Sequence, residues 1–246
     1  MKTPTEASQA TPTLADQRVL VVGASASVGP ALVSALLAHG ANVVATSRTG
    51  VGLPEAVAVT PEALDLAHLP SLDAFIDKVA LQGWRFDVVV MLAGILPGKA
   101  LHDYTDQMMQ DVMQSHFMGQ ASLIRRLLPM LNDEAQVVMM SSISGERGSF
   151  DPIYAASKAA QIAFVKSMAS WLAPKVRFNA IAPALIEGST MFDAMAPERR
   201  AYHREQSPTK RLTTAAELAG VIVDLCGPSW KNLNGQVIRI NGGVHV

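Results

Sequence analysis

Apolar residues follow two alternating patterns along this chain. Short runs of β-branched and other aliphatic residues predict buried strands, and longer stretches with apolar residues at helical spacing predict helices between them. The predicted strands are Arg18–Gly23, Asn42–Thr46, a short segment ending near Asp65, Phe86–Leu92, Gln136–Ser141, Val176–Ala182 and Gln236–Ile240. The predicted helices are Val28–His39, Pro70–Leu81, Ile153–Leu172 and Thr214–Leu225, with a long amphipathic segment over Tyr104–Leu131.

This alternation predicts the α/β class. Strands joined by helical crossovers form a mainly parallel sheet with helices on both faces. We expect one doubly wound Rossmann domain over residues 16–246, preceded by a flexible leader at 1–15. No apolar run of 18 residues occurs, so a transmembrane helix is not expected.

Composition narrows the class of protein further. Hydrophobic residues make up 49% of the chain and aromatic residues only 5%, which predicts an aliphatic core. A net charge of −1 argues against nucleic acid or an anionic membrane as the main partner. The single cysteine, Cys226, excludes an intrachain disulfide, and its apolar surroundings predict a buried side chain. We expect a cytoplasmic enzyme with a small-molecule partner and no metal.

The first predicted strand ends in a turn of small residues that opens a helix. Small side chains there let the backbone approach a pyrophosphate, which binds exposed N–H groups at the helix N-terminus. Rossmann folds bind their dinucleotide at this point. The candidate cofactor residues in this turn are Gly23, Ser25, Ser27, Val28 and Gly29.

The end of the second strand bears on the choice of cofactor. Sites that prefer NAD commonly place an acidic residue there, whereas an arginine accommodates the 2′-phosphate of NADP. This chain has Arg48 and no carboxylate at that point. We therefore expect NADP rather than NAD, the alternative being that Arg48 is a solvated surface residue.

The sequence Tyr154-Ala155-Ala156-Ser157-Lys158 follows shortly after Ser141-Ser142-Ile143-Ser144-Gly145. Residues four apart share one face of a helix, so Tyr154 and Lys158 can point into one cleft. A nearby ammonium favours the phenolate and is expected to lower the tyrosine pKa. A tyrosine, a lysine and a serine in this arrangement can move a proton on or off an alcohol oxygen.

Taken together, these motifs resemble the short-chain dehydrogenase/reductase family in its single-domain form, over about Gln17 to Gly243. Tyr154 and Lys158 match the family's catalytic pair, and Ser142 with Gly145 matches its Ser-x-x-Gly. The resemblance implies an oxidoreductase that interconverts a ketone and a secondary alcohol. It further implies a homotetramer or homodimer. Further matches are Asp65-Leu66, which in the family contacts the adenine, Leu92-Ala93-Gly94, Pro183 with Ile186 near the nicotinamide, and Asn234 through Gly243.

Carried over to this sequence, the resemblance makes Tyr154 the general acid/base and Ser142 the donor to the substrate oxygen. Lys158 would hold the nicotinamide ribose. Ser141 competes with Ser142 because the spacing back from Tyr154 fits it better. We prefer Ser142, since the spacing to Gly145 anchors the turn.

The chain departs from the family pattern at four positions. Ser27 replaces a glycine of the phosphate turn, Leu92 replaces the asparagine of Asn-Ala-Gly, and Ala184 replaces a glycine after Pro183. His116 stands where the family has an asparagine that holds a water for proton transfer. An imidazole can relay protons near neutral pH, and the alternative is a histidine that only packs between helices.

Residues at about 184–213 are expected to form a substrate lid, with Met191 and Phe192 as candidate substrate contacts. The arginines that follow suit a solvated face better than an anion clamp. Two other functions stay open. One is a dinucleotide-binding sensor or partner subunit without catalysis, and the other is a lyase or epimerase on the same fold.

Overall fold

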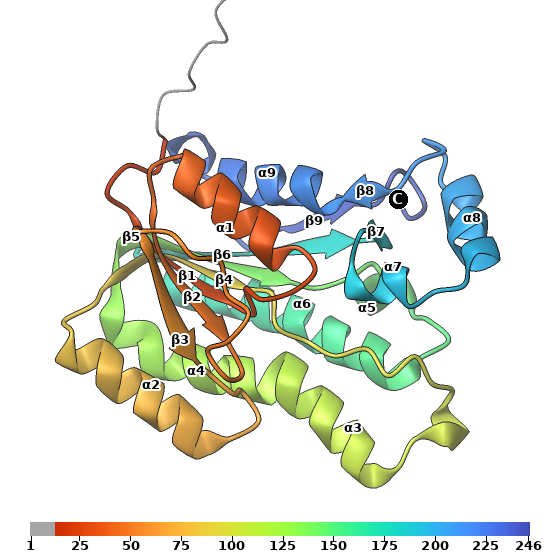
Figure 1. Ribbon diagram of the computed structural model, residues 1–246, viewed down its shortest axis with the longest axis horizontal. Helices are drawn as coiled ribbons and strands as arrows, with labels where there is room; N and C mark the ends of the chain where they lie inside the picture. Colours follow the sequence, from red (N-terminus) through yellow and green to blue (C-terminus); the bar gives the residue numbers. More distant parts are fainter. Residues whose placement is uncertain (1–12) are drawn as a thin grey trace, which may run out of the picture.

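The computed structural model describes residues 13–246, which form a seven-stranded parallel sheet (Figure 1). The strand order is β3-β2-β1-β4-β5-β6-β9, so the direction of winding reverses between β1 and β4. Ligands of doubly wound sheets bind at such a reversal, beyond the carboxyl ends of the strands. The strands are β1 (Arg18–Val22), β2 (Asn42–Ser47), β3 (Val59–Ala63), β4 (Phe86–Met91), β5 (Leu131–Met140), β6 (Val176–Pro183) and β9 (Val237–Ile240).

Helices cover both faces of this sheet (Figure 1). Helices α1 (Gly29–Ala38) and α9 (Ala215–Cys226) pack on one face around Leu32, Val90 and Ile222. The opposite face carries α2 (Leu69–Leu81), α4 (Gly119–Leu127) and α6 (Pro152–Leu172). The expected doubly wound α/β fold is confirmed. No helix in residues 13–246 is long and apolar enough to cross a bilayer.

The long amphipathic segment predicted over Tyr104–Leu131 is divided in the structure. It contains α3 (Asp106–Met113), a π-helical turn η2 (Gln114–Met118), α4 and a 3₁₀ turn η3 (Leu128–Met130). The helical turns end at Met130, one residue before the approximate predicted limit, because Leu131 begins β5 and pairs with Phe86. A π-turn widens a helix by one residue and often marks a functional site.

The boundary of the expected leader also needs correction. Residues 1–12 lie outside the described part of the chain. Leu14 is fully buried, and its backbone N–H donates to the carbonyl of His39. The packed domain therefore begins before residue 16.

The short elements between the main helices and strands were not predicted individually. They are η1 (Leu101–Asp103), α5 (Ser144–Arg147), the parallel pair β7 (Ile186–Glu187) and β8 (Thr213–Thr214), α7 (Thr190–Asp193), α8 (Pro197–Gln206) and η4 (Pro228–Trp230). The single cysteine, Cys226, is buried as expected, and burial raises the pKa of its thiol to about 12.

Candidate active site

Gly23 and Gly29 shape the turn between β1 and α1. Gly23 has a φ of +88°, and a Cβ there would lie 2.7 Å from the backbone nitrogen of Ala93. A Cβ on Gly29 would lie 2.5 Å from the carbonyl carbon of Ala24. The first turn of α1 has no side-chain cap and no acidic residue, so the N-terminus of this helix suits an anion. The turn therefore fits the pyrophosphate of a dinucleotide.

Ser27 lies in the middle of this turn in a left-handed conformation, with a φ of +53°. Its hydroxyl accepts a hydrogen bond from the backbone nitrogen of Thr190 at 3.3 Å and lies 3.2 Å from the Thr190 hydroxyl. The phosphate turn thus contacts α7, which belongs to the expected substrate lid. Ser25 is exposed, whereas Val28 is buried against α1.

The predicted adenosine contacts lie at the carboxyl ends of β2 and β3. The side chain of Arg48 is exposed, directly after β2. The Asp65 carboxylate accepts a hydrogen bond from the backbone nitrogen of Ala67, and Leu66 is buried next to Gly119. Arg48 and Asp65 therefore follow neighbouring strands at the same edge of the sheet.

The segment after β4 lies against β1. The backbone nitrogens of Leu92 and Ala93 both donate to the carbonyl of Val22, at 2.9 and 3.0 Å. Gly94 comes next and is packed against the imidazole of His116. Backbone bonds to Val22 hold this segment beside the phosphate turn without the asparagine that Leu92 replaces.

Tyr154, Lys158 and Ser142 come together at the carboxyl edge of the sheet. The Lys158 ammonium lies 5.8 Å from the centre of the Tyr154 ring and donates to the carbonyl of Met140 at 2.7 Å. The Ser142 side chain lies close enough to the Tyr154 phenol to lower its pKa. Gly145 permits this arrangement, because a Cβ there would lie 2.6 Å from the carbonyl carbon of Lys158.

The two neighbouring serines have different partners. The Ser141 hydroxyl donates to the carbonyl of Lys158 at 2.9 Å, and Ser141 is 2% exposed. Ser142 instead faces Tyr154, and its hydroxyl also accepts from the backbone nitrogen of Ser144 at 3.1 Å. The Ser141 hydroxyl is thus occupied by a backbone carbonyl, and the catalytic role of Ser142 stays a prediction.

Burial controls the electrostatics of this group. Burial raises the pKa of Tyr154 above its ordinary value, although the Ser142 hydrogen bond opposes that shift; the charge of Asp151 adds to it. Burial also lowers the pKa of Lys158 to about 7. The expectation of a lowered Tyr154 pKa was therefore wrong, because removal from water outweighs the stabilisation of the phenolate.

His116 lies in the π-turn η2, is 1% exposed, and has both ring nitrogens occupied. Its Nε2 accepts a hydrogen bond from the backbone nitrogen of Ile95 at 2.8 Å. Its Nδ1 lies 2.7 Å from the hydroxyl of Ser157, which itself donates to the carbonyl of Tyr154 at 2.7 Å. The proton of the neutral imidazole must therefore be on Nδ1, donating to Ser157. Burial lowers the pKa of His116 to about 2. The geometry favours the packing interpretation over proton relay.

The two candidate substrate contacts of the expected lid, Met191 and Phe192, differ in exposure. Phe192 is buried, with the Arg200 guanidinium 4.8 Å from the centre of its ring, and Met191 is 38% exposed. Pro183 ends β6 and pairs with Ile240, and Ile186 pairs with Thr213. Arg200 donates to the carbonyls of Asp193 and Met195, and Arg204 forms an ion pair with Glu187.

Asp151 belongs to this site and was missed in the sequence. It is 1% exposed and caps α6 three residues before Tyr154. The signal was present, because Asp followed by Pro before a helical run is typical of an N-cap and first helical position.

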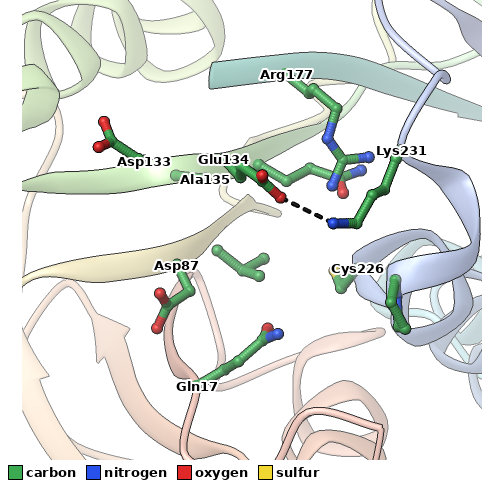
Figure 2. A pocket seen from close by; sticks show the side chains of 12 residues that line it. Gln17, Asp87, Asp133, Glu134, Ala135, Arg177, Cys226 and Lys231 are labelled. Carbon is green, nitrogen blue, oxygen red and sulfur yellow. Dashed lines mark hydrogen bonds and ion pairs between the residues drawn. The ribbon is translucent and has the colours of Figure 1, made fainter. Parts of the chain in front are cut away.

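A cavity of about 250 Å³ lies at the opposite, amino edge of the sheet. Figure 2 shows its polar lining, including Gln17, Asp87, Arg177 and the Glu134–Lys231 ion pair. None of the predicted site residues lines it. Within residues 13–246, no three His, Cys, Asp or Glu side chains are grouped to hold a metal.

Comparison with known proteins identifies the family. The family model described as enoyl-(acyl carrier protein) reductase matches residues 23–245. The chain belongs to the short-chain dehydrogenase/reductase family. Its relatives in this family include an uncharacterised oxidoreductase, YmfI, of Bacillus subtilis, which is 28% identical over 94% of this chain and 99% of that protein.

Other members of the family share the whole architecture. The 3-oxoacyl-[acyl-carrier-protein] reductase FabG of Vibrio cholerae is 28% identical over 92% of this chain and 96% of its own. A solved short-chain dehydrogenase/reductase of Brucella melitensis, named as a glucose/ribitol dehydrogenase, superposes with a TM-score of 0.90. It is 25% identical and covers 96% of this chain and 99% of its own.

Proposed function

We propose that this member of the short-chain dehydrogenase/reductase family reduces a ketone to a secondary alcohol with NADPH. The observation that carries the proposal is the meeting of Ser142, Tyr154 and Lys158 at the carboxyl edge of the sheet. Relatives that are named as 3-oxoacyl-[acyl-carrier-protein] reductases make a 3-oxoacyl thioester the first substrate to test. The expected homo-oligomer stays a prediction.

The chain offers a fitting place for the dinucleotide. Gly23 and Gly29 leave the backbone open where the pyrophosphate would lie, at the uncapped N-terminus of α1. Arg48 supplies a cation for a 2′-phosphate, and Lys158 is the residue that the family resemblance assigns to the nicotinamide ribose. A bound NADPH supplies the hydride for the reaction.

Tyr154 acts as the general acid in this proposal. Its raised pKa keeps the phenol protonated at neutral pH, so its hydroxyl can donate a proton to the carbonyl oxygen as negative charge develops there. The Ser142 hydroxyl donates a second hydrogen bond to the same oxygen and orients the ketone. The buried Lys158 ammonium lies near the phenol and stabilises the phenolate that remains.

The test is NADPH oxidation with a panel of ketones and 3-oxoacyl thioesters, with Tyr154→Phe and Tyr202→Phe run beside the wild type. Loss of a general acid should lower kcat by about a hundredfold or more. Tyr202 is exposed on α8, so its variant should retain turnover. NADPH binding without turnover of any substrate would instead support a sensor, and turnover unaffected by Tyr154→Phe would refute the mechanism.

A further inference from the structure

The carboxylate of Asp151 accepts four hydrogen bonds although the residue is almost fully buried. Its Oδ1 accepts from the Tyr104 hydroxyl at 2.7 Å and from the backbone nitrogen of Tyr154 at 2.9 Å. Its Oδ2 accepts from the backbone nitrogens of Gly98 and Lys99 at 3.0 and 3.2 Å. Burying a carboxylate is costly unless it is satisfied in this way. A helix cap alone requires only one acceptor, so three of these bonds serve another purpose.

His116 makes the matching connection on the other side of Tyr154. Through Ser157 it reaches the backbone carbonyl of Tyr154, and through Nε2 it holds the backbone nitrogen of Ile95. Its ring also packs edge-on against the Tyr154 ring, with the centroids 5.5 Å apart. The carbonyl of His116 accepts from Gln161 at 2.8 Å, which fixes the π-turn against α6.

The two side chains therefore act on the same pair of segments. Asp151 binds the N–H of Tyr154 and the loop at Gly98 and Lys99, whereas His116 reaches the C=O of Tyr154 and binds the loop at Ile95. We name residues 95–99 the β4 loop. We propose that Asp151 and His116 are positioning residues that fix the backbone of Tyr154 and lock the β4 loop beside it.

The β4 loop has few other means of holding its place. Residues 92–100 contain no helix or strand, and Ile95 and Leu96 are 43% and 37% exposed. The backbone of Ile95 is tied to His116, whose ring packs against Tyr154. We infer that the loop held in this way presents these two apolar side chains to the ketone and aligns it with the phenol.

This inference rests on the proposed function for its catalytic consequence, but the clamp itself can be measured without turnover. Hydrogen exchange of the backbone amides of Ile95, Gly98 and Lys99 reports directly on the β4 loop. If the proposed function is wrong, the wild type should not turn over the ketones. If the proposed positioning role is wrong, amide exchange in the β4 loop should be the same in the variants as in the wild type.

The variant Asp151→Ser separates the capping of α6 from the binding of the β4 loop. Serine is a good N-cap and can still accept from Tyr154, but its single short hydroxyl cannot bind Gly98, Lys99 and Tyr104 together. We expect faster exchange in the β4 loop and a loss of kcat/KM for the ketone of about tenfold to a hundredfold. The dissociation constant for NADPH should stay within about twofold of the wild type, since every predicted contact of the dinucleotide remains in place.

Asp151→Asn is the second variant and decides the question if Asp151→Ser does not fold. Its amide nitrogen cannot accept, so either the N–H groups of Gly98 and Lys99 or that of Tyr154 lose their acceptor, and their exchange should become faster while the shape of the residue is kept. The groups that face Tyr154 are then Lys158 and the neutral His116, with Tyr104 behind Asp151. Removal of the negative charge should move the alkaline limb of the rate profile to lower pH. Unchanged exchange at Gly98, Lys99 and Tyr154, or kcat/KM within about threefold of the wild type in both variants, would overturn the proposal.

His116 offers a matched pair of replacements. The amide of His116→Gln reaches the position of Nε2 and can still accept from Ile95, whereas that of His116→Asn reaches only Nδ1 and can still donate to Ser157. We expect His116→Asn to speed exchange at Ile95 and His116→Gln to leave it slow. Equal exchange at Ile95 in the two variants would contradict the clamp. A proton relay through the imidazole itself would instead be lost in both, because neither amide titrates, and the pH profile would change in the same way.

Discussion

Gly94 and His116 lie so close together that a side chain on Gly94 would overlap the imidazole. A Cβ there would be 2.5 Å from Nε2 and 2.7 Å from Cδ2 of the ring. The ring cannot move aside easily, because hydrogen bonds to Ile95 and Ser157 hold both of its nitrogens. The glycine after Ala93 is thus required by the histidine that stands in the π-turn.

Gly94→Ala should therefore destabilise the protein by about 1–3 kcal/mol, which is typical of overpacking a filled interior. Denaturant unfolding measures the change. Gly220→Ala is the control, because a Cβ on Gly220 meets nothing within 4 Å in α9 and alanine favours the helix. If Gly94→Ala is as stable as the control, His116 is free to move and the ring is not fixed as described.

Ser27→Gly should stabilise the protein by up to about 1 kcal/mol. A serine at a φ of +53° pays a steric cost that glycine avoids, while the exposed bonds to Thr190 return little of it. Ser25→Gly is the matched control, since Ser25 has no positive φ and should gain nothing. If Ser27→Gly is no more stable than the wild type, the bonds to Thr190 outweigh the strain.

Arg48→Ala should weaken NADPH binding about tenfold or more and leave NADH binding nearly unchanged. The reason is that a charge-assisted bond to the 2′-phosphate is lost, and NADH lacks this group. Fluorescence titration with both nucleotides measures the effect. Lys231→Ala removes an equal charge at the other edge of the sheet and should change neither affinity. Equal weakening for the two nucleotides would remove Arg48 from the phosphate site.

Lys158 should make stability depend on pH. Its pKa is about 7 in the folded protein, compared with 10.5 for an ordinary lysine. Below pH 7 the folded and unfolded states are both protonated, so the folded state bears the full cost of burying the charge. Above pH 7 only the unfolded lysine keeps its proton, and the unfolding free energy should rise up to about pH 10, by on the order of 3–5 kcal/mol.

Urea unfolding at pH 7, 8 and 9, without added nucleotide, tests this dependence. Lys158→Met should be more stable than the wild type at pH 7 and should show a flatter profile. The exposed Lys166 lies on the same helix, and Lys166→Met should keep the rise. A wild-type profile that falls from pH 7 to pH 9 would contradict the lowered pKa.

Much of the fold was predictable, because buried parallel strands leave continuous aliphatic runs such as Val88 to Met91 in the sequence. The residues of the site were predictable where a motif has fixed local spacing, as between Tyr154 and Lys158. Partners far apart in sequence left no such signal. Asp151 is tied to Gly98 across 53 positions, and His116 is tied to Ser157 across 41.

The predicted direction of the Tyr154 pKa shift was wrong for a related reason. Sequence spacing showed the nearby lysine, but it could not show how deeply the phenol is buried. Likewise, the choice between Ser141 and Ser142 depends on which hydroxyl is on the side of the Tyr154 phenol and which binds the Lys158 carbonyl, and the loop length alone left this open.

The separation of these partners along the chain affects the order in which the active site forms and is lost during folding and unfolding. The turn that holds Tyr154 reaches its final geometry only after β4, the π-turn η2 and α6 have all docked, because hydrogen bonds from all three meet there. Catalytic competence should therefore appear late in refolding, after the sheet has formed. During a partial opening of the native state it should also be lost early, while most of the sheet is still intact.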